Sequence, residues 1–112
     1  HTRDFIYVKD VVKVNFYFWD HPEISGIFNC GTGHAHQFNT LAKGVLKHFG
    51  SGELEYVPFP EVLKGKYQSF TQADTANLLA AGYDGGFTPI EDAIAEYCEL
   101  LDKTGGYYVY ER

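Results

Sequence analysis

The residues of this sequence that are best suited to ligand chemistry gather in one loop, residues 64–72. The loop carries two lysines, Lys64 and Lys66, a tyrosine, Tyr67, and several amide and hydroxyl side chains, in a chain that is otherwise acidic. Lysines can bind a diphosphate, and a tyrosine can stack on a base or hydrogen-bond to a sugar. The composition favours a site for an anionic, hydroxylated ligand, but a solvated loop with one packed aromatic ring fits it equally.

Arg3 is the second candidate for binding an anion. It lies beside Asp4, directly before an apolar run. A guanidinium can form a two-pronged contact with a phosphate or a structural ion pair with a carboxylate. The sequence leaves both roles open for Arg3.

The other candidate ligand-binding residues fit simpler roles. The turn from Gly31 to Gly33 lacks the third glycine of the dinucleotide-binding pattern G-x-G-x-x-G, because His36 stands at that position. We interpret it as a tight turn between a strand and a helix, with a phosphate nearby as the alternative. His34 and His36 beside Cys30 match no standard zinc spacing, so no metal ligands are predicted.

The sequence also predicts no catalytic residue. It contains neither a G-x-S-x-G motif nor a cysteine–histidine signature, and Cys98 falls on the buried face of a predicted helix. Carboxylate pairs such as Asp20 and Glu23 lie at helix boundaries, where they cap or solvate a helix more often than they transfer protons.

The elements that must position Arg3 and the loop are predicted by local patterns. Residues 5–8 form an apolar β run, and Asp10 follows as the expected N-cap of a helix that Pro22 ends. The aromatic and β-branched residues of this segment make a strand over residues 11–19 the alternative.

Further strands and helices alternate along the rest of the chain. The strands are predicted at residues 26–30 and 53–57. The helices are predicted from residue 39 to a cap at Gly50, from Asp74 to residue 81 before Gly82, and from a capping box at residues 88–91 to residue 103. This alternation predicts an α/β fold.

The composition excludes several classes of function. The 112 residues are 45% apolar, enough for one domain with its own core. Nine basic against 15 acidic residues give a net charge of -6, which argues against binding to nucleic acid. No apolar stretch approaches the roughly 20 residues that span a bilayer, so we expect a cytoplasmic protein without a membrane partner. Cys30 and Cys98 are expected to be core thiols.

Three motifs, at residues 3–11, 26–33 and 63–74, resemble one family in their order and sequence. They are similar to the ADP-L-glycero-D-manno-heptose 6-epimerases, which belong to the extended short-chain dehydrogenase/reductases. The first two motifs are shared among many such enzymes that act on nucleotide sugars, whereas the third, which continues to residue 84, is more particular. The resemblance extends over residues 3–103 and corresponds to the C-terminal third of a family member.

The resemblance implies a fold and a function. Residues 1–104 would be the C-terminal, substrate-binding portion of a Rossmann-type α/β enzyme, without the N-terminal half that binds NADP. The family interconverts ADP-D-glycero- and ADP-L-glycero-D-manno-heptose, a precursor of the lipopolysaccharide inner core. By resemblance, Arg3 and Tyr67 bind the ADP-sugar. The family's Tyr-x-x-x-Lys pair and glycine-rich cofactor loop are absent from the 112 residues, so this portion alone is expected to be inactive.

Three expectations concern the whole molecule. Residues 105–112 form an aromatic tail that either pairs with a sheet edge or is disordered. A substrate-binding portion without its cofactor half exposes apolar surface, so we expect a homo-oligomer. The alternative functions are a freestanding binding or oligomerisation module without a reaction, and part of another nucleotide-diphospho-sugar epimerase or dehydratase.

Overall fold

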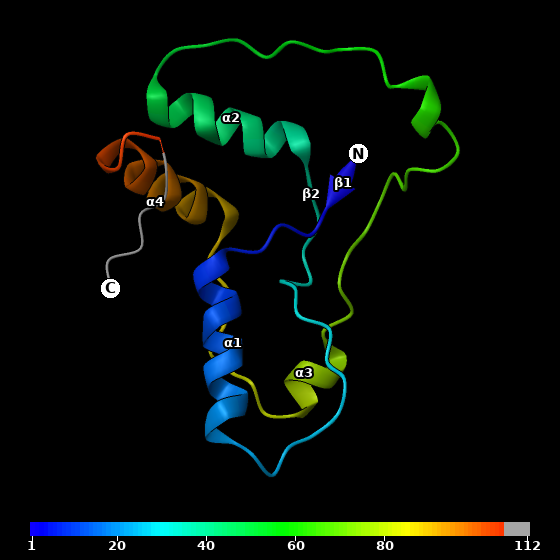
Figure 1. The fold of residues 1–112 in the computed structure, drawn as a ribbon, viewed down its shortest axis with the longest axis vertical. Coiled ribbons are helices and arrows are strands. Elements are labelled where there is room, and N and C mark those ends of the chain that lie inside the picture. Colours follow the sequence, from blue (N-terminus) through cyan, green and yellow to red (C-terminus); the bar gives the residue numbers. More distant parts are fainter. Residues whose placement is uncertain (107–112) are drawn as a thin grey trace.

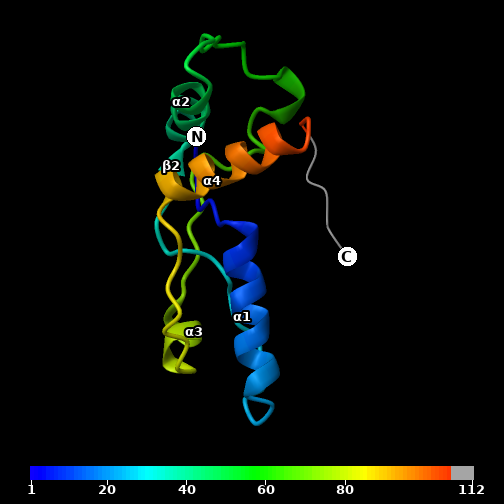
Figure 2. The same cartoon turned by 90° about the vertical axis from the view of Figure 1, so that its left-hand side faces the viewer.

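The computed structural model describes residues 1–106, which form a flat assembly of helices joined by long loops (Figure 1). The helices and strands are β1 Thr2–Arg3, α1 Val8–Asp20, β2 His36–Gln37, α2 Phe38–Phe49, the short 3-10 helix η1 Glu61–Leu63, α3 Ala76–Ala80 and α4 Ile90–Lys103. α2 and α4 lie at one end of the molecule, α1 leads from there toward the other end, and the short α3 lies near that other end (Figures 1 and 2). The mixture of helix and strand is compatible with the predicted α/β class.

Within residues 1–106, the apolar core consists of two small clusters. One joins Val14 of α1 to Leu78 of α3 and to Tyr83. The other lies between α4 and α2, with Ile94 at its centre. Gly44 permits this close packing, since a Cβ atom there would lie 2.8 Å from Cδ1 of Ile94. The chain therefore has two local packing centres in place of one continuous core.

All four helix predictions are confirmed, with small shifts at their ends. α1 ends at Asp20, before Pro22, and α2 ends at Gly50, whose φ of 71° and N–H bond to the carbonyl of Leu46 are those of a left-handed cap. α3 is preceded by Asp74, whose carboxylate accepts the N–H of Ala76 at 3.0 Å. α4 ends at Lys103, as predicted. These signals lie within a few residues of the helices that they define.

Two predicted helix caps are wrong because their side chains bind each other. Asp10 lies inside α1, whose N-cap is Tyr7, and it is only 2% exposed. Its carboxylate accepts the N–H of Thr88 at 2.7 Å and the hydroxyl of Thr88 at 2.9 Å. Thr88 forms no capping box, and the N-cap of α4 is Pro89, without a side-chain cap hydrogen bond. The pair instead ties α1 to the start of α4.

The strands predicted at residues 5–8, 26–30 and 53–57 are not formed. Within residues 1–106 the sheet is a two-residue antiparallel ladder, in which Thr2 pairs with Gln37 and Arg3 with His36. Ile27, at the centre of the second predicted strand, is 93% exposed. A β run becomes a strand only where a neighbouring strand accepts its backbone hydrogen bonds, and this part of the chain supplies none.

Three further expectations have different outcomes. Cys98 is buried as predicted, whereas Cys30 is exposed, because the strand that would have buried it is absent. No helix within residues 1–106 has the length and apolar character needed to cross a membrane. The aromatic tail begins at residue 105, and most of it, residues 107–112, lies outside the described residues.

Candidate functional site

Arg3 lies in β1, and β1 lies against the candidate ligand-binding loop, residues 64–72. The N–H of Thr2 donates to the carbonyl of Ser69 at 2.8 Å, and the N–H of Thr71 donates to the carbonyl of Thr2 at 3.1 Å. Thr2 thereby forms a parallel bridge to Phe70. These backbone bonds hold residues 69–71 against β1, although the two segments lie far apart in the sequence.

Arg3 and Tyr67, the two residues that the resemblance assigned to ligand binding, are in direct contact. The guanidinium carbon of Arg3 lies 4.6 Å from the centre of the Tyr67 ring, within the range of a cation–π interaction. Nη1 of Arg3 donates to the carbonyl of Thr2 at 2.8 Å, and Nη2 donates to the carbonyl of Gln68. The tertiary structure therefore fixes both ends of the guanidinium beside the loop.

Two more rings, His1 and Phe59, lie against Tyr67. We call these three residues the aromatic cluster. The His1 ring stacks on Phe59 with centroids 5.1 Å apart and meets Tyr67 edge-on at 5.0 Å. Phe59 and Tyr67 are 5.7 Å apart. Phe59 was not predicted as a site residue, because it lies outside the loop at residues 64–72.

The charge of Arg3 is not neutralised by a carboxylate among the described residues. Its neighbour Asp4 is engaged elsewhere, so the ion pair that the sequence left open is not formed. The carboxylate of Asp4 accepts the N–H of Thr32 at 2.9 Å, the hydroxyl of Thr32 at 2.5 Å, and the N–H groups of Gly33 at 2.9 Å and Ala73 at 3.2 Å. Arg3 thus keeps an uncompensated positive charge beside stacked rings.

The hydrogen bonds to Asp4 also determine its ionisation. Partial burial raises the pKa of Asp4, but the bonds from Thr32, Gly33 and Ala73 outweigh this effect and hold the pKa below its ordinary value of 3.8. Because the amides of Thr32 and Gly33 donate to Asp4, they do not face a ligand phosphate. Gly31 is required at this turn, since a Cβ atom there would lie 2.9 Å from Oδ2 of Asp4.

The two loop lysines differ in their surroundings. Lys64 pairs with Glu61 of η1 at 2.6 Å, and both side chains are exposed. Lys66 makes no ion pair with any residue in the range 1–106. A surface pair such as Lys64–Glu61 is weak and can exchange for a ligand anion, so the loop contributes positive charge near Tyr67.

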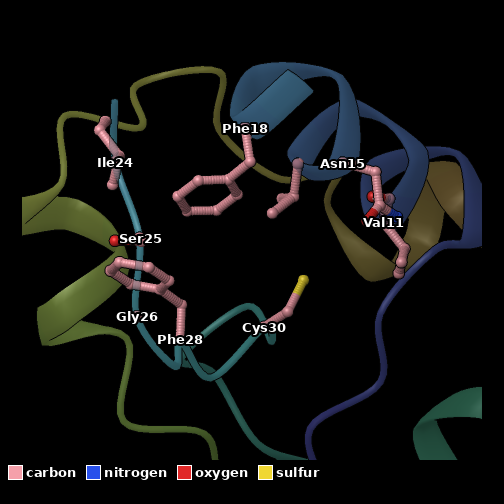
Figure 3. Close-up of a pocket in the computed structure, with 9 residues that line it drawn as sticks. Val11, Asn15, Phe18, Ile24, Ser25, Gly26, Phe28 and Cys30 are labelled. Atoms are coloured by element: carbon pink, nitrogen blue, oxygen red, sulfur yellow. The ribbon is translucent and has the colours of Figure 1, made fainter. Parts of the chain in front are cut away.

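A separate hollow of about 350 Å³ lies between α1 and residues 24–30 (Figure 3). Phe18 of α1 stacks on Phe28 across it with centroids 4.8 Å apart, and the thiol of Cys30 lies at its wall. Although Cys30 as a residue is exposed, partial desolvation of its sulfur at this wall raises the pKa of the thiol, and the nearby Asp10 and Asp4 add to this effect. The thiol therefore stays protonated at neutral pH, which is unfavourable for a nucleophile.

Two features of the described residues bear on metal and cofactor binding. No group of three or more histidine, cysteine, aspartate or glutamate side chains is arranged to bind a metal within residues 1–106. The one glycine turn that resembles a cofactor loop binds Asp4 with its amides. The geometry instead places a fixed guanidinium beside an aromatic cluster, a combination whose chemistry suits a phosphorylated ligand.

Comparisons with known proteins agree with the resemblance found from the motifs. No family model matches the chain. The chain is 50% identical over 105 residues to the ADP-L-glycero-D-manno-heptose-6-epimerase of Brachyspira hyodysenteriae, a match that covers 94% of this chain and 33% of that protein. It is 54% identical over 99 residues to the protein of the same name from Alkalilimnicola ehrlichii, covering 88% of this chain and 31% of that protein.

These matches confirm that the chain is similar to named epimerases, and they show what share of the length of such an enzyme the chain covers. The chain spans about a third of the length of the curated relatives that it matches. The similarity at 50–54% identity extends over 88–94% of the chain.

Proposed function

We propose that this chain is the substrate-binding portion of an NADP-dependent epimerase that interconverts ADP-D-glycero- and ADP-L-glycero-D-manno-heptose for the lipopolysaccharide inner core. The observation that carries the proposal is the contact between Arg3 and Tyr67, 4.6 Å from guanidinium carbon to ring centre. Two residues assigned to one ligand by resemblance would need to lie together, and the fold brings them together although they lie far apart in the sequence.

The chemistry of the pair suits the diphosphate and nucleoside parts of an ADP-sugar. The guanidinium has five N–H donors, of which the two bonds to the Thr2 and Gln68 carbonyls use only part. The remaining donors can bind phosphate oxygens, because no carboxylate of residues 1–106 pairs with Arg3. Tyr67 is 41% exposed and offers a ring face and a hydroxyl to the ligand.

The proposal includes NADP as the cofactor, but it does not assign NADP binding to these 112 residues. The cofactor and the acid–base pair are assigned to the part of the longer protein that this chain does not span. The 112 residues would therefore bind an ADP-sugar without converting it. A cytoplasmic location is also part of the proposal, supported by two free cysteines that are not joined in a disulfide.

Calorimetric titration of ADP into the longer protein that contains this chain tests the proposal that Arg3 binds the ADP part of the ligand. Arg3→Ala should weaken ADP binding roughly 10- to 100-fold, because a charge-assisted hydrogen bond contributes about 1.5–3 kcal/mol. Arg3→Lys should recover only part of the affinity, since lysine keeps the charge but not the planar fork. The control is Lys103→Ala, which removes an exposed cation paired with Glu99 on α4.

Two results would contradict the proposal. One is unchanged ADP affinity in Arg3→Ala, and the other is an equal loss in Lys103→Ala. Thermal unfolding of each variant separates a lost contact from a lost fold, because Arg3 also holds the Gln68 carbonyl. Unaided conversion of an ADP-heptose by the 112 residues would likewise overturn the assignment of the reaction to another part of the protein.

A further inference from the structure

The carboxylate of Asp4 is fully occupied by donors from within the chain. Oδ1 accepts the N–H and the hydroxyl of Thr32, and Oδ2 accepts the N–H groups of Gly33 and Ala73. An ionised carboxylate has about four lone-pair positions, so these donors use its whole capacity. Asp4 is ionised at neutral pH, because its pKa lies below its ordinary value of 3.8. It therefore has no free acceptor with which to contact a ligand directly.

Asp4 holds the chain at the point where it leaves the candidate loop, residues 64–72. Ala73 directly follows this loop, and its N–H donates to Asp4 at 3.2 Å. Residues 69–71 are held just before it by the two backbone bonds of Thr2. Thr2 and Asp4 thus bind the chain from residue 69 to residue 73, which runs beside β1 on its way to α3 (Figure 1).

Arg3 lies between these two anchoring residues. Its guanidinium reaches the carbonyl of Gln68 and the ring of Tyr67, which come directly before the anchored segment. The backbone of Arg3 cannot slide along the loop without breaking the bonds of Thr2 or those of Asp4. The distance of 4.6 Å between the guanidinium carbon and the centre of the Tyr67 ring is therefore set in part by the hydrogen bonds of Asp4.

The glycine turn at residues 31–33 supports Asp4 and Ala73 from the other side. A Cβ atom on Gly31 would lie 2.4 Å from Cβ of Ala73 and 2.9 Å from Oδ2 of Asp4, so the turn packs directly on both residues. An asparagine at position 4 would turn its NH2 group toward N–H donors of the turn or of Ala73 in either orientation of the amide. Such a change would push these segments apart and leave the side chains of Arg3 and Tyr67 themselves intact.

We propose that Asp4 is a positioning residue of the ligand site: it holds the loop and the backbone of Arg3 in the arrangement that binds an ADP-sugar, and it does not contact the ligand. The identity of the ligand rests on the proposed function, whereas the positioning rests on contacts within this chain. Loss of Asp4 should weaken binding although Arg3 and Tyr67 remain, because binding groups must be held within about 0.5 Å of their productive geometry.

Calorimetric titration of ADP into the longer protein that contains this chain tests the positioning role. Asp4→Asn should weaken ADP binding about fivefold or more. Asp10→Asn is the matched control, because Asp10 is also a carboxylate that joins two segments, but it holds Thr88 and not the loop. Its ADP affinity should stay within about twofold of the parent value. Unchanged affinity in Asp4→Asn, or an equal loss in Asp10→Asn, overturns the proposal.

Two variants of Thr32 repeat the test with a smaller change. Thr32→Val removes the hydroxyl donor to Asp4 and keeps the backbone N–H bond, whereas Thr32→Ser keeps both donors. We expect ADP to bind roughly threefold more weakly to Thr32→Val than to the parent protein, and Thr32→Ser to bind ADP like the parent. Equal ADP affinities of the two variants overturn the proposal, even where Asp4→Asn fails to fold.

Hydrogen exchange without any ligand separates the positioning role from the proposed function. The N–H of Thr71 donates to the carbonyl of Thr2 at 3.1 Å, so its exchange rate reports whether β1 stays on the loop. This N–H should exchange about fivefold faster or more in Asp4→Asn, and at the parent rate in Asp10→Asn. Equal rates in all three proteins overturn the proposal. A parent protein that binds no ADP, together with faster Thr71 exchange in Asp4→Asn, would remove the proposed function and leave the positioning role of Asp4.

Discussion

Two aspartate side chains, Asp4 and Asp10, join segments of this molecule that no sheet connects. Asp4 gathers the amides of Thr32, Gly33 and Ala73 around one carboxylate, and Asp10 does the same for the start of α4 through Thr88. In a larger sheet, backbone partners would hold such segments together. Here two carboxylates do so, and Asp4 also leaves its neighbour Arg3 without a compensating charge.

The lowered pKa of Asp4 predicts how stability depends on pH. The unfolded chain takes up the proton of Asp4 near pH 3.8, whereas the folded chain takes it up only at lower pH. The stabilisation from ionised Asp4 is therefore fully present above about pH 4 and is lost as the pH falls through its folded pKa. Urea unfolding between pH 2 and 6 should show a smaller loss of stability for Asp4→Asn than for the parent protein, and an equal loss in both would contradict the prediction.

At the scale of elements, the contact between α2 and α4 is the most extensive one between helices in the described chain. Gly44 lets the two helices approach, since its missing Cβ would lie 2.8 Å from Cδ1 and 3.2 Å from Cγ2 of Ile94. His48 at the end of α2 also bonds to Asp102 of α4 at 2.8 Å. The pair of helices forms a unit against which Phe5, close to Arg3, is packed.

Gly44→Ala tests this close approach. Alanine alone would favour the helix by about 1 kcal/mol, but overpacking against Ile94 costs about 1–3 kcal/mol, so we expect a net loss of stability in denaturant unfolding. Ile94→Val removes Cδ1 and should restore stability to the double variant relative to Gly44→Ala. The control Lys43→Ala changes an exposed position of α2. A Gly44→Ala protein that is more stable than its parent would show that the helices can move apart without cost.

For the molecule as a whole, the dominant feature is uncovered apolar surface. Its two clusters bury few large side chains, and Trp19 and Ile27 are 81% and 93% exposed. The predicted homo-oligomer is a proposal supported by this exposure. Light scattering of the isolated 112-residue chain should show association that increases with concentration, and Phe16→Asp should reduce it. A strictly monomeric species at high concentration would contradict this expectation.

The sequence by itself determined the four helices, because their caps, breakers and apolar spacing all lie within a few residues of the bonds that they control. It also offered Arg3 and Tyr67 as candidate ligand-binding residues, and the motifs that resemble a family assigned both to one ligand. The three strands could not be predicted reliably from local runs, since a strand depends on a partner elsewhere in the chain.

Only the tertiary structure decided which distant groups meet. It placed the Arg3 guanidinium over Tyr67, added Phe59 to the site, and directed Asp4 to the glycine turn and away from Arg3. No local pattern specifies these contacts, because each joins segments separated by long loops. Their geometry depends on the packing of the whole chain, and a pattern of a few residues carries no information about that packing.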